Sequence, residues 1–120
     1  MKALLIISHG SRREESNDEV RKLANKIANK KSNIDKVGCA FLSLSEPTIE
    51  KAVSDLVQEG ALEIIVFPFF LSAGNLVAID IPEIIKNEEQ KYTGVNFKMI
   101  SHLGAVKGVG DIIIDEVNRA

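Results

Sequence analysis

Short apolar segments alternate along the chain with longer segments in which apolar residues recur at helical spacing. Three apolar segments are nearly continuous and rich in branched or aromatic residues, and a fourth alternates: residues 3–8, 37–43, 63–69 and 95–101. Continuous apolar runs of this length are typical of strands that are buried on both faces, as in a parallel sheet. We therefore predict four strands at these positions.

The segments between the predicted strands carry the pattern of amphipathic helices. Ser16 and Glu19 have the spacing of a capping box, which predicts the start of the first helix. A second helix is predicted between Pro47 and Gly60, and two more over about 80–86 and 107–118. The polar segment 86–94 is predicted as a loop. The first two helices each present one apolar face: Val20, Leu23, Ala24, Ile27 and Ala28; then Ile49, Ala52, Val53, Leu56 and Val57.

This alternation predicts a single α/β domain over residues 1–120. Right-handed β-α-β crossovers place helices on both faces of a sheet, so we expect a three-layer sandwich around a four-stranded parallel sheet. By analogy with flavodoxin-like folds, the expected strand order is 2-1-3-4. In such sheets ligands bind beyond the carboxyl ends of the strands, close to the point where the strand order reverses.

Composition and charge exclude several classes of function and of site. The 120 residues are 45% hydrophobic and 27% charged, and the formal net charge of −2 argues against broad binding to nucleic acid or acidic membranes. The only cysteine, Cys39, excludes an internal disulfide and a cysteine-based zinc site. The N-terminal apolar run is too short for a signal peptide or a membrane span. We expect a soluble cytoplasmic protein with no nucleic-acid or membrane partner.

No nucleotide cofactor is expected, because the chain contains neither a G-x-G-x-x-G fingerprint nor a Walker lysine motif. Candidate chemistry lies instead at the predicted strand ends. His9 follows the first strand and is suited to act as a base or a metal ligand, or else only to hydrogen-bond its own loop. Gly10 beside it permits a tight turn or the close approach of a ligand. Glu46, after the second strand, is either a base or metal ligand or a first-turn acid that complements a helix dipole.

The third strand continues into an unusually apolar stretch, residues 68–83, which passes through the turn-forming pair Gly74 and Asn75. These side chains either cap the core or line a pocket or a subunit interface, since contiguous apolar surface is rarely left uncovered. The second histidine, His102, follows the fourth strand. In the expected strand order it lies roughly 10 Å from the first strand, too far to share one metal with His9. We predict that His102 is a loop residue.

Five motifs, taken together, resemble one family. "LLIISHGSR", "LSEPTIEKAV", "GALEIIVFPFFLSAG", "VAIDIPEII" and "LGAVKGVGDIIIDEV" resemble, in order and spacing, the small sirohydrochlorin chelatases of the CbiX type. The resemblance spans nearly the whole chain. It implies a class II, chelatase-like fold and ATP-independent insertion of cobalt or nickel, with iron possible, into a sirohydrochlorin-type tetrapyrrole during the biosynthesis of cobalamin or a related cofactor. It also implies a homodimer with the active site between the subunits.

The resemblance further implies residue roles. His9 matches the first family histidine, as metal ligand and catalytic residue, and Glu46 matches a second catalytic position. Leu76 stands where the family carries its second metal histidine, and Ser43 where some relatives carry an additional glutamate. The residues implied to contact the tetrapyrrole are Gly10, Ser11, Arg12, Phe70, Ser72, Ala73, Gly74, Asn75 and Leu76.

Two main hypotheses follow. The first is a homodimeric chelatase in which His9 of each subunit faces one cleft. The second is a non-catalytic tetrapyrrole-binding or carrier protein on the same scaffold, favoured by the replacement of the second histidine by Leu76. A third reading, an interaction module without a small ligand, leaves the apolar stretch 68–83 unexplained.

Overall fold

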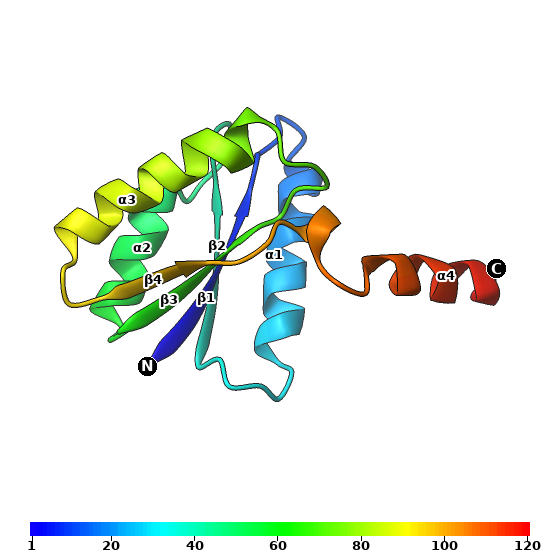
Figure 1. Cartoon of the computed structure of the whole chain (residues 1–120), viewed down its shortest axis with the longest axis horizontal. Helices are drawn as coiled ribbons and strands as arrows, with labels where there is room; N and C mark the ends of the chain where they lie inside the picture. The colour runs from blue at the N-terminus through cyan, green and yellow to red at the C-terminus, as the bar shows by residue number, and fades with distance from the viewer.

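The computed structural model describes residues 1–120 and is built around a four-stranded parallel sheet in the order β2-β1-β3-β4 (Figure 1). The pairing places Ile6 of β1 between Cys39 of β2 and Phe67 of β3. The predicted parallel sheet and its strand order are confirmed. The strands are β1 (Lys2–Ser8), β2 (Lys36–Phe41), β3 (Glu63–Pro68) and β4 (Asn96–Met99).

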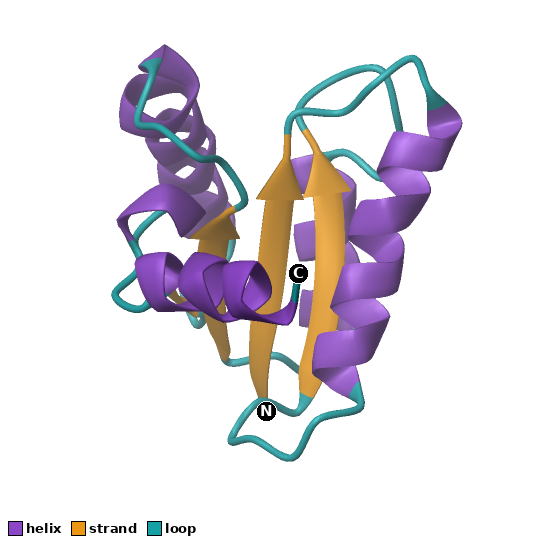
Figure 2. Cartoon of the chain, turned by 90° about the vertical axis from the view of Figure 1, so that its right-hand side faces the viewer, coloured by secondary structure: helices purple, strands orange, loops and turns teal.

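Helices flank the sheet on both faces, as the alternating pattern predicts (Figure 2). None of them combines the length and the apolar character needed to span a bilayer. The helical elements are α1 (Glu14–Ala28), α2 (Ile49–Gln58), η1 (Leu76–Asp80), α3 (Ile81–Lys91), η2 (Leu103–Ala105) and α4 (Val109–Arg119).

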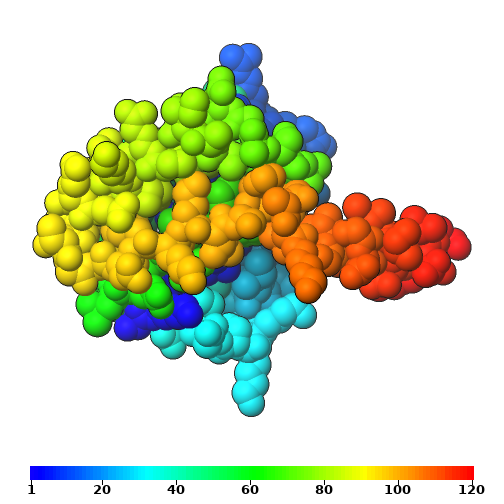
Figure 3. Space-filling model, viewed as in Figure 1, coloured from blue at the N-terminus to red at the C-terminus, as the bar shows by residue number.

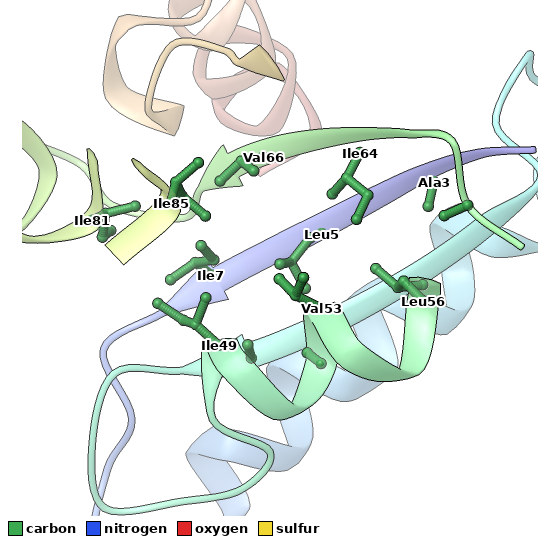
Figure 4. Close-up of a cluster of buried hydrophobic side chains, with 13 residues drawn as sticks. Ala3, Leu5, Ile7, Ile49, Val53, Leu56, Ile64, Val66, Ile81 and Ile85 are labelled. Atoms are coloured by element: carbon green, nitrogen blue, oxygen red, sulfur yellow. The ribbon is translucent and has the colours of Figure 1, made fainter. Parts of the chain in front are cut away.

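The main core lies between the sheet and helices α2 and α3. Alternate residues of the strands point to this face, as a period of two requires, and interdigitate with the apolar faces of the two helices (Figure 4). Leu5, Val53, Ile64 and Ile81 are each fully buried there. Helix α2 is fixed at its start by the Thr48 hydroxyl, which accepts a hydrogen bond from the Lys51 amide.

Helix α1 covers the opposite face of the sheet, over β1 and β2. Its Val20 and Ala24 pack with Ile6 and Phe41 in a smaller buried cluster. The predicted capping box is wrong, because α1 begins at Glu14 and Ser16 lies inside its first turn. Asn17 stabilises this end instead: its side-chain oxygen accepts a hydrogen bond from the Ser11 amide, and its amide group donates to the Ser11 carbonyl.

The polar segment 86–94, predicted as a loop, is helical as far as Lys91. Glu88 occupies a position on the buried side of α3, seven residues after Ile81 and three after Ile85. Its side chain is only 1% exposed and accepts a hydrogen bond of 2.8 Å from the Lys91 ammonium group. Because a charged residue occupies a buried helical position, the sequence pattern did not indicate that the helix continues to Lys91.

Candidate active-site cavity

A surface cavity of about 510 Å³ opens at the carboxyl ends of β1 and β2, beside η1 and the first two turns of α3. It therefore lies beyond the carboxyl ends of the strands, the side on which open α/β sheets bind ligands. Its volume is within the range typical of small-molecule sites. The lining residues are His9, Leu42, Ser43, Leu76, Asp80, Glu83, Ile84 and Asn87.

His9 leaves the tip of β1 and presents an exposed imidazole to the cavity. Its Nδ1 lies 3.0 Å from the carbonyl oxygen of Gly10. A carbonyl only accepts hydrogen bonds, so this contact is a hydrogen bond in the tautomer whose Nδ1 carries the proton. In the neutral ring, Nε2 then keeps its lone pair, which is the atom that can bind a metal ion or take a proton.

The loop after β1 and the loop after β2 are in direct contact beside His9. The Ser43 amide donates a hydrogen bond of 3.1 Å to the His9 carbonyl oxygen. Gly10 has a φ of +94°, and a Cβ added there would lie 1.8 Å from the Ser43 carbonyl oxygen. The position therefore requires glycine, both for its left-handed backbone and for the close approach of the two loops.

A second part of the cavity lining comes from one continuous helical segment, η1 and α3. Leu76 in η1 is followed at helical spacing by Asp80, Glu83 and Asn87, all lining the cavity. The sequence analysis placed the helix start at Asp80, but helical structure begins with the π-turn Leu76–Asp80. The i, i+4, i+7, i+11 spacing from Leu76 is the signal that could have identified these cavity residues.

Of the residues predicted for the site, only His9 and Leu76 line the cavity, where they are joined by Ser43. Leu76 lies in the helical segment after β3, and His9 lies in the loop after β1. Phe70 packs against the main core, while Glu46, Arg12 and residues 72–75 are exposed outside the lining. The predicted residues outside the lining are Gly10, Ser11, Arg12, Glu46, Phe70, Ser72, Ala73, Gly74 and Asn75. His102, predicted as a loop residue, precedes η2 as its N-cap.

Within one chain, no group of three or more His, Cys, Asp or Glu side chains is arranged to hold a metal ion. His9, Asp80 and Glu83 border the same cavity without converging on one point. A single subunit therefore offers a metal ion scattered ligands, with the imidazole and the carboxylates on different elements.

Arg21 of α1 holds the loop after β2 from outside the cavity. One guanidinium nitrogen, Nη2, donates to the Ser45 hydroxyl at 2.9 Å and to the Glu46 carbonyl oxygen at 2.8 Å. The other, Nη1, donates to the carboxylates of Glu14 and Asp18, and the Glu14 hydrogen bond is the main reason that the pKa of Arg21 is raised. The loop needs this support, because Leu44 holds a left-handed φ of 64°.

We expect Arg21→Ala to loosen this loop without unfolding the domain. The Ser43 amide, bonded to the His9 carbonyl, should exchange its hydrogen roughly tenfold faster, because hydrogen bonds from a charged group hold the loop closed. Hydrogen exchange followed by NMR measures this directly. Arg13→Ala is the matched control, since Arg13 pairs only with exposed Glu15; equal exchange in both variants would show that Arg21 does not position the loop.

The sheet topology and the cavity define the chain as a parallel α/β domain with a cavity at the carboxyl ends of its strands. The family model for CbiX matches residues 3–120, and the chain belongs to the CbiX family. This confirms the resemblance on which the sequence interpretation rested.

Two curated relatives illustrate the range of chain lengths. The chain is 32% identical over 116 residues to a chloroplastic sirohydrochlorin ferrochelatase of Arabidopsis thaliana, covering 97% of this chain but 51% of that protein. It is 30% identical over 124 residues to a sirohydrochlorin cobaltochelatase of Methanosarcina acetivorans, covering 98% of this chain and 95% of that one. The chain thus spans about half the length of some relatives and nearly all of others.

Solved structures agree with the fold. The sirohydrochlorin chelatase SirB from Bacillus subtilis subspecies spizizenii, in complex with cobalt, superposes with a TM-score of 0.83 at 26% identity, covering 98% of this chain and 50% of that one. A CbiX protein from Marinobacter aquaeolei VT8 matches over 100% of both chains with a TM-score of 0.80 and 24% identity. At this identity, the similarity to the Marinobacter aquaeolei protein supports the fold and nothing further.

Proposed function

We propose that the protein inserts a divalent metal ion, cobalt or nickel and also iron, into a sirohydrochlorin-type tetrapyrrole without ATP. The observation that carries the proposal is the His9 imidazole, which lines the cavity while its Nδ1 lies 3.0 Å from the Gly10 carbonyl oxygen. The names of the relatives, sirohydrochlorin ferrochelatase and cobaltochelatase, support the substrate class. The metal ion is a substrate here.

The reaction exchanges two protons for one metal ion. Two pyrrole N–H bonds break, bonds from the ring nitrogens to the metal form, and no atom is oxidised or reduced. The protein must hold the ion loosely and accept protons. His9 supplies a lone pair for either task, while Asp80 and Glu83 attract the cation and take up protons on the opposite wall.

The cavity also suits a flat ring with a charged rim. Leu42, Leu76 and Ile84 provide apolar surface against which the face of a tetrapyrrole packs. Arg12, which is exposed on the loop after His9, is proposed to bind a rim carboxylate. Glu46 remains a proposed helper rather than a cavity residue, because only its backbone carbonyl has a described partner, Arg21.

We propose that the active form is a cytoplasmic homodimer. Each subunit lacks the second family histidine, since Leu76 stands in its place. Two subunits that bring their His9 side chains to one cleft restore a pair of imidazoles, the number that the family site implies.

Restoring the missing histidine tests this reading of the site. We expect Leu76→His to tighten binding of Co²⁺ at least tenfold, because a second imidazole joins His9 in the same cavity. Isothermal titration with the metal alone measures this. Leu71→His is the matched control, because Leu71 is 76% exposed and lies outside the cavity lining. Equal gains in both variants would show that position 76 is not part of a metal site.

A second function, binding or carrying a tetrapyrrole without metal insertion, is favoured by the same Leu76 and by the scattered ligands of a single chain. One assay, the rate of sirohydrochlorin metallation, distinguishes the two functions. A carrier binds sirohydrochlorin and leaves the rate of metallation at its protein-free value, and it gains activity only as the Leu76→His variant. A chelatase accelerates metallation in its natural form.

A further inference from the structure

Asn17 is one of two polar residues buried in the domain, and it contacts the loop that carries His9. Its side chain belongs to α1, and the residue is 2% exposed. Its oxygen accepts a hydrogen bond of 2.9 Å from the Ser11 amide, and its nitrogen donates one of 2.8 Å to the Ser11 carbonyl oxygen. The loop itself lies at the surface, near the helical segment after β3 (Figure 3). A buried side chain thus holds the backbone of an exposed loop.

The hydrogen-bond partners of Asn17 determine which way its amide group points. The side-chain nitrogen also donates a hydrogen bond of 3.2 Å to the Glu14 carboxylate. With oxygen and nitrogen exchanged, the NH₂ group would face the N–H of Ser11, and the oxygen would face a carbonyl and a carboxylate. The oxygen of Asn17 therefore faces the Ser11 amide.

That amide belongs to the peptide between Gly10 and Ser11. The peptide is trans, since the cis bond of the chain is Glu46-Pro47. In a planar trans peptide the N–H and the C=O point in opposite directions, so an acceptor that fixes the Ser11 N–H also fixes the Gly10 carbonyl oxygen. This oxygen lies 3.0 Å from Nδ1 of His9 and is the one hydrogen-bond partner of the imidazole. Asn17 therefore acts on the imidazole through one rigid peptide plane.

The peptide needs such an anchor because a glycine precedes it. Gly10 has a φ of +94°, and a residue without a side chain can adopt several backbone conformations. The Ser43 amide holds the His9 carbonyl oxygen, which belongs to the peptide before Gly10. The peptide after Gly10 is held by Asn17 alone, apart from its contact with the imidazole.

We propose that Asn17 is a positioning residue that sets the tautomer of His9. By fixing the peptide between Gly10 and Ser11, it keeps a carbonyl oxygen at Nδ1, so that the ring proton stays there and Nε2 keeps its lone pair. Nε2 is then available for the divalent metal ion or for a pyrrole proton. This inference rests on the proposed function and deepens it. Histidines that bind metals generally donate their other ring N–H to a fixed acceptor, which sets the tautomer in this way.

Nitrogen NMR of the histidine rings tests the proposal without metal ion or tetrapyrrole. In alkaline solution, where imidazoles are neutral, we expect His9 of the natural protein to be mainly the Nδ1–H tautomer. Asn17→Ala should shift the ratio toward the Nε2–H tautomer roughly threefold or more, the scale of one net hydrogen bond. Asn25→Ala, an exposed position of the same helix, is the matched control and should leave the ratio unchanged. A mainly Nε2–H tautomer in the natural protein, or an unchanged ratio in Asn17→Ala, would overturn the proposal.

Asn17→Asp separates positioning from stability. The aspartate keeps an oxygen for the Ser11 amide, but it loses both donated hydrogen bonds and places a second carboxylate beside Glu14. We expect unfolding by urea to show a loss of stability, while His9 remains mainly the Nδ1–H tautomer. A tautomer ratio that changed in parallel with stability in both variants would show a merely structural role and overturn the proposal. The natural protein and Asn17→Asp decide the matter even if Asn17→Ala does not fold.

Metallation is measured separately, so that the two proposals can fail independently. In Asn17→Ala we expect kcat for metal insertion to fall roughly tenfold while KM for sirohydrochlorin stays within about twofold, because the surface that packs on the ring is unchanged. The expected tautomer in a natural protein that does not accelerate metallation would refute the proposed function alone. Metallation by a protein whose tautomer does not depend on Asn17 would refute this inference alone.

Discussion

His9→Ala is expected to slow metal insertion by roughly 10²- to 10³-fold, the usual effect of removing a group that transfers protons or binds the reacting ion. His9 is the only imidazole that lines the cavity. Its Nδ1 is bonded to the Gly10 carbonyl, so the substitution removes the free Nε2 and leaves the backbone of the loop in place. Initial rates of metallation at saturating tetrapyrrole measure the effect.

The control for this substitution is His102→Ala. His102 is the only other histidine of the chain and lies outside the cavity lining. Its removal should change the rate less than twofold. If His9→Ala retained the natural rate, the site built on His9 would be wrong, whatever the effect of the control.

Gly10→Ala is expected to destabilise the protein by about 2–5 kcal/mol, since strain and steric overlap act together there. The backbone φ of +94° disfavours any side chain, and the new Cβ would lie 1.8 Å from the Ser43 carbonyl oxygen. The two loops that carry His9 and Ser43 must then separate. Unfolding by urea measures the loss of stability.

Gly60→Ala separates the two causes. Gly60 follows α2 with a φ of +103°, almost the same backbone conformation, but a Cβ added there meets nothing within 4 Å. Its replacement should cost only about 1–2 kcal/mol, the price of the left-handed backbone alone. Equal losses at the two glycines would show that the loops beside His9 are not in tight contact.

The layers and the strand order followed from the sequence because strand burial leaves a direct trace. Continuous apolar runs such as residues 63–69 occur where both faces of a strand are covered, and right-handed crossovers then restrict the topology. The residues of the cavity were harder to predict from the sequence than the fold was. His9 was found because a histidine at the first strand tip is conspicuous, and Leu76 was found through the family resemblance.

The errors share one physical origin, which is that helix ends depend on tertiary contacts. Asp80 and Pro82 resemble a helix start, yet the π-turn from Leu76 extends the helix backward. Asp80 and Glu83 were therefore not predicted as cavity residues. Ser16 was read as a cap, although Asn17 provides the hydrogen bonds at that end. The charged Glu88 made the last part of α3 resemble a loop, although this residue is buried in the helix.

The exposure of α4 was not predictable from its own pattern. An apolar stripe at helical spacing predicts burial, but it does not say against which surface or in which chain. Only the arrangement in space shows that the apolar side chains of α4 lie exposed.

The most direct test of the proposed activity follows the absorbance of sirohydrochlorin during metallation by Co²⁺, with and without the natural protein. The account predicts an initial rate that rises in proportion to protein concentration and saturates with tetrapyrrole. A spectral shift that reports ring binding, with a metallation rate equal to that in protein-free solution, would contradict it and leave a tetrapyrrole-binding protein on a chelatase scaffold.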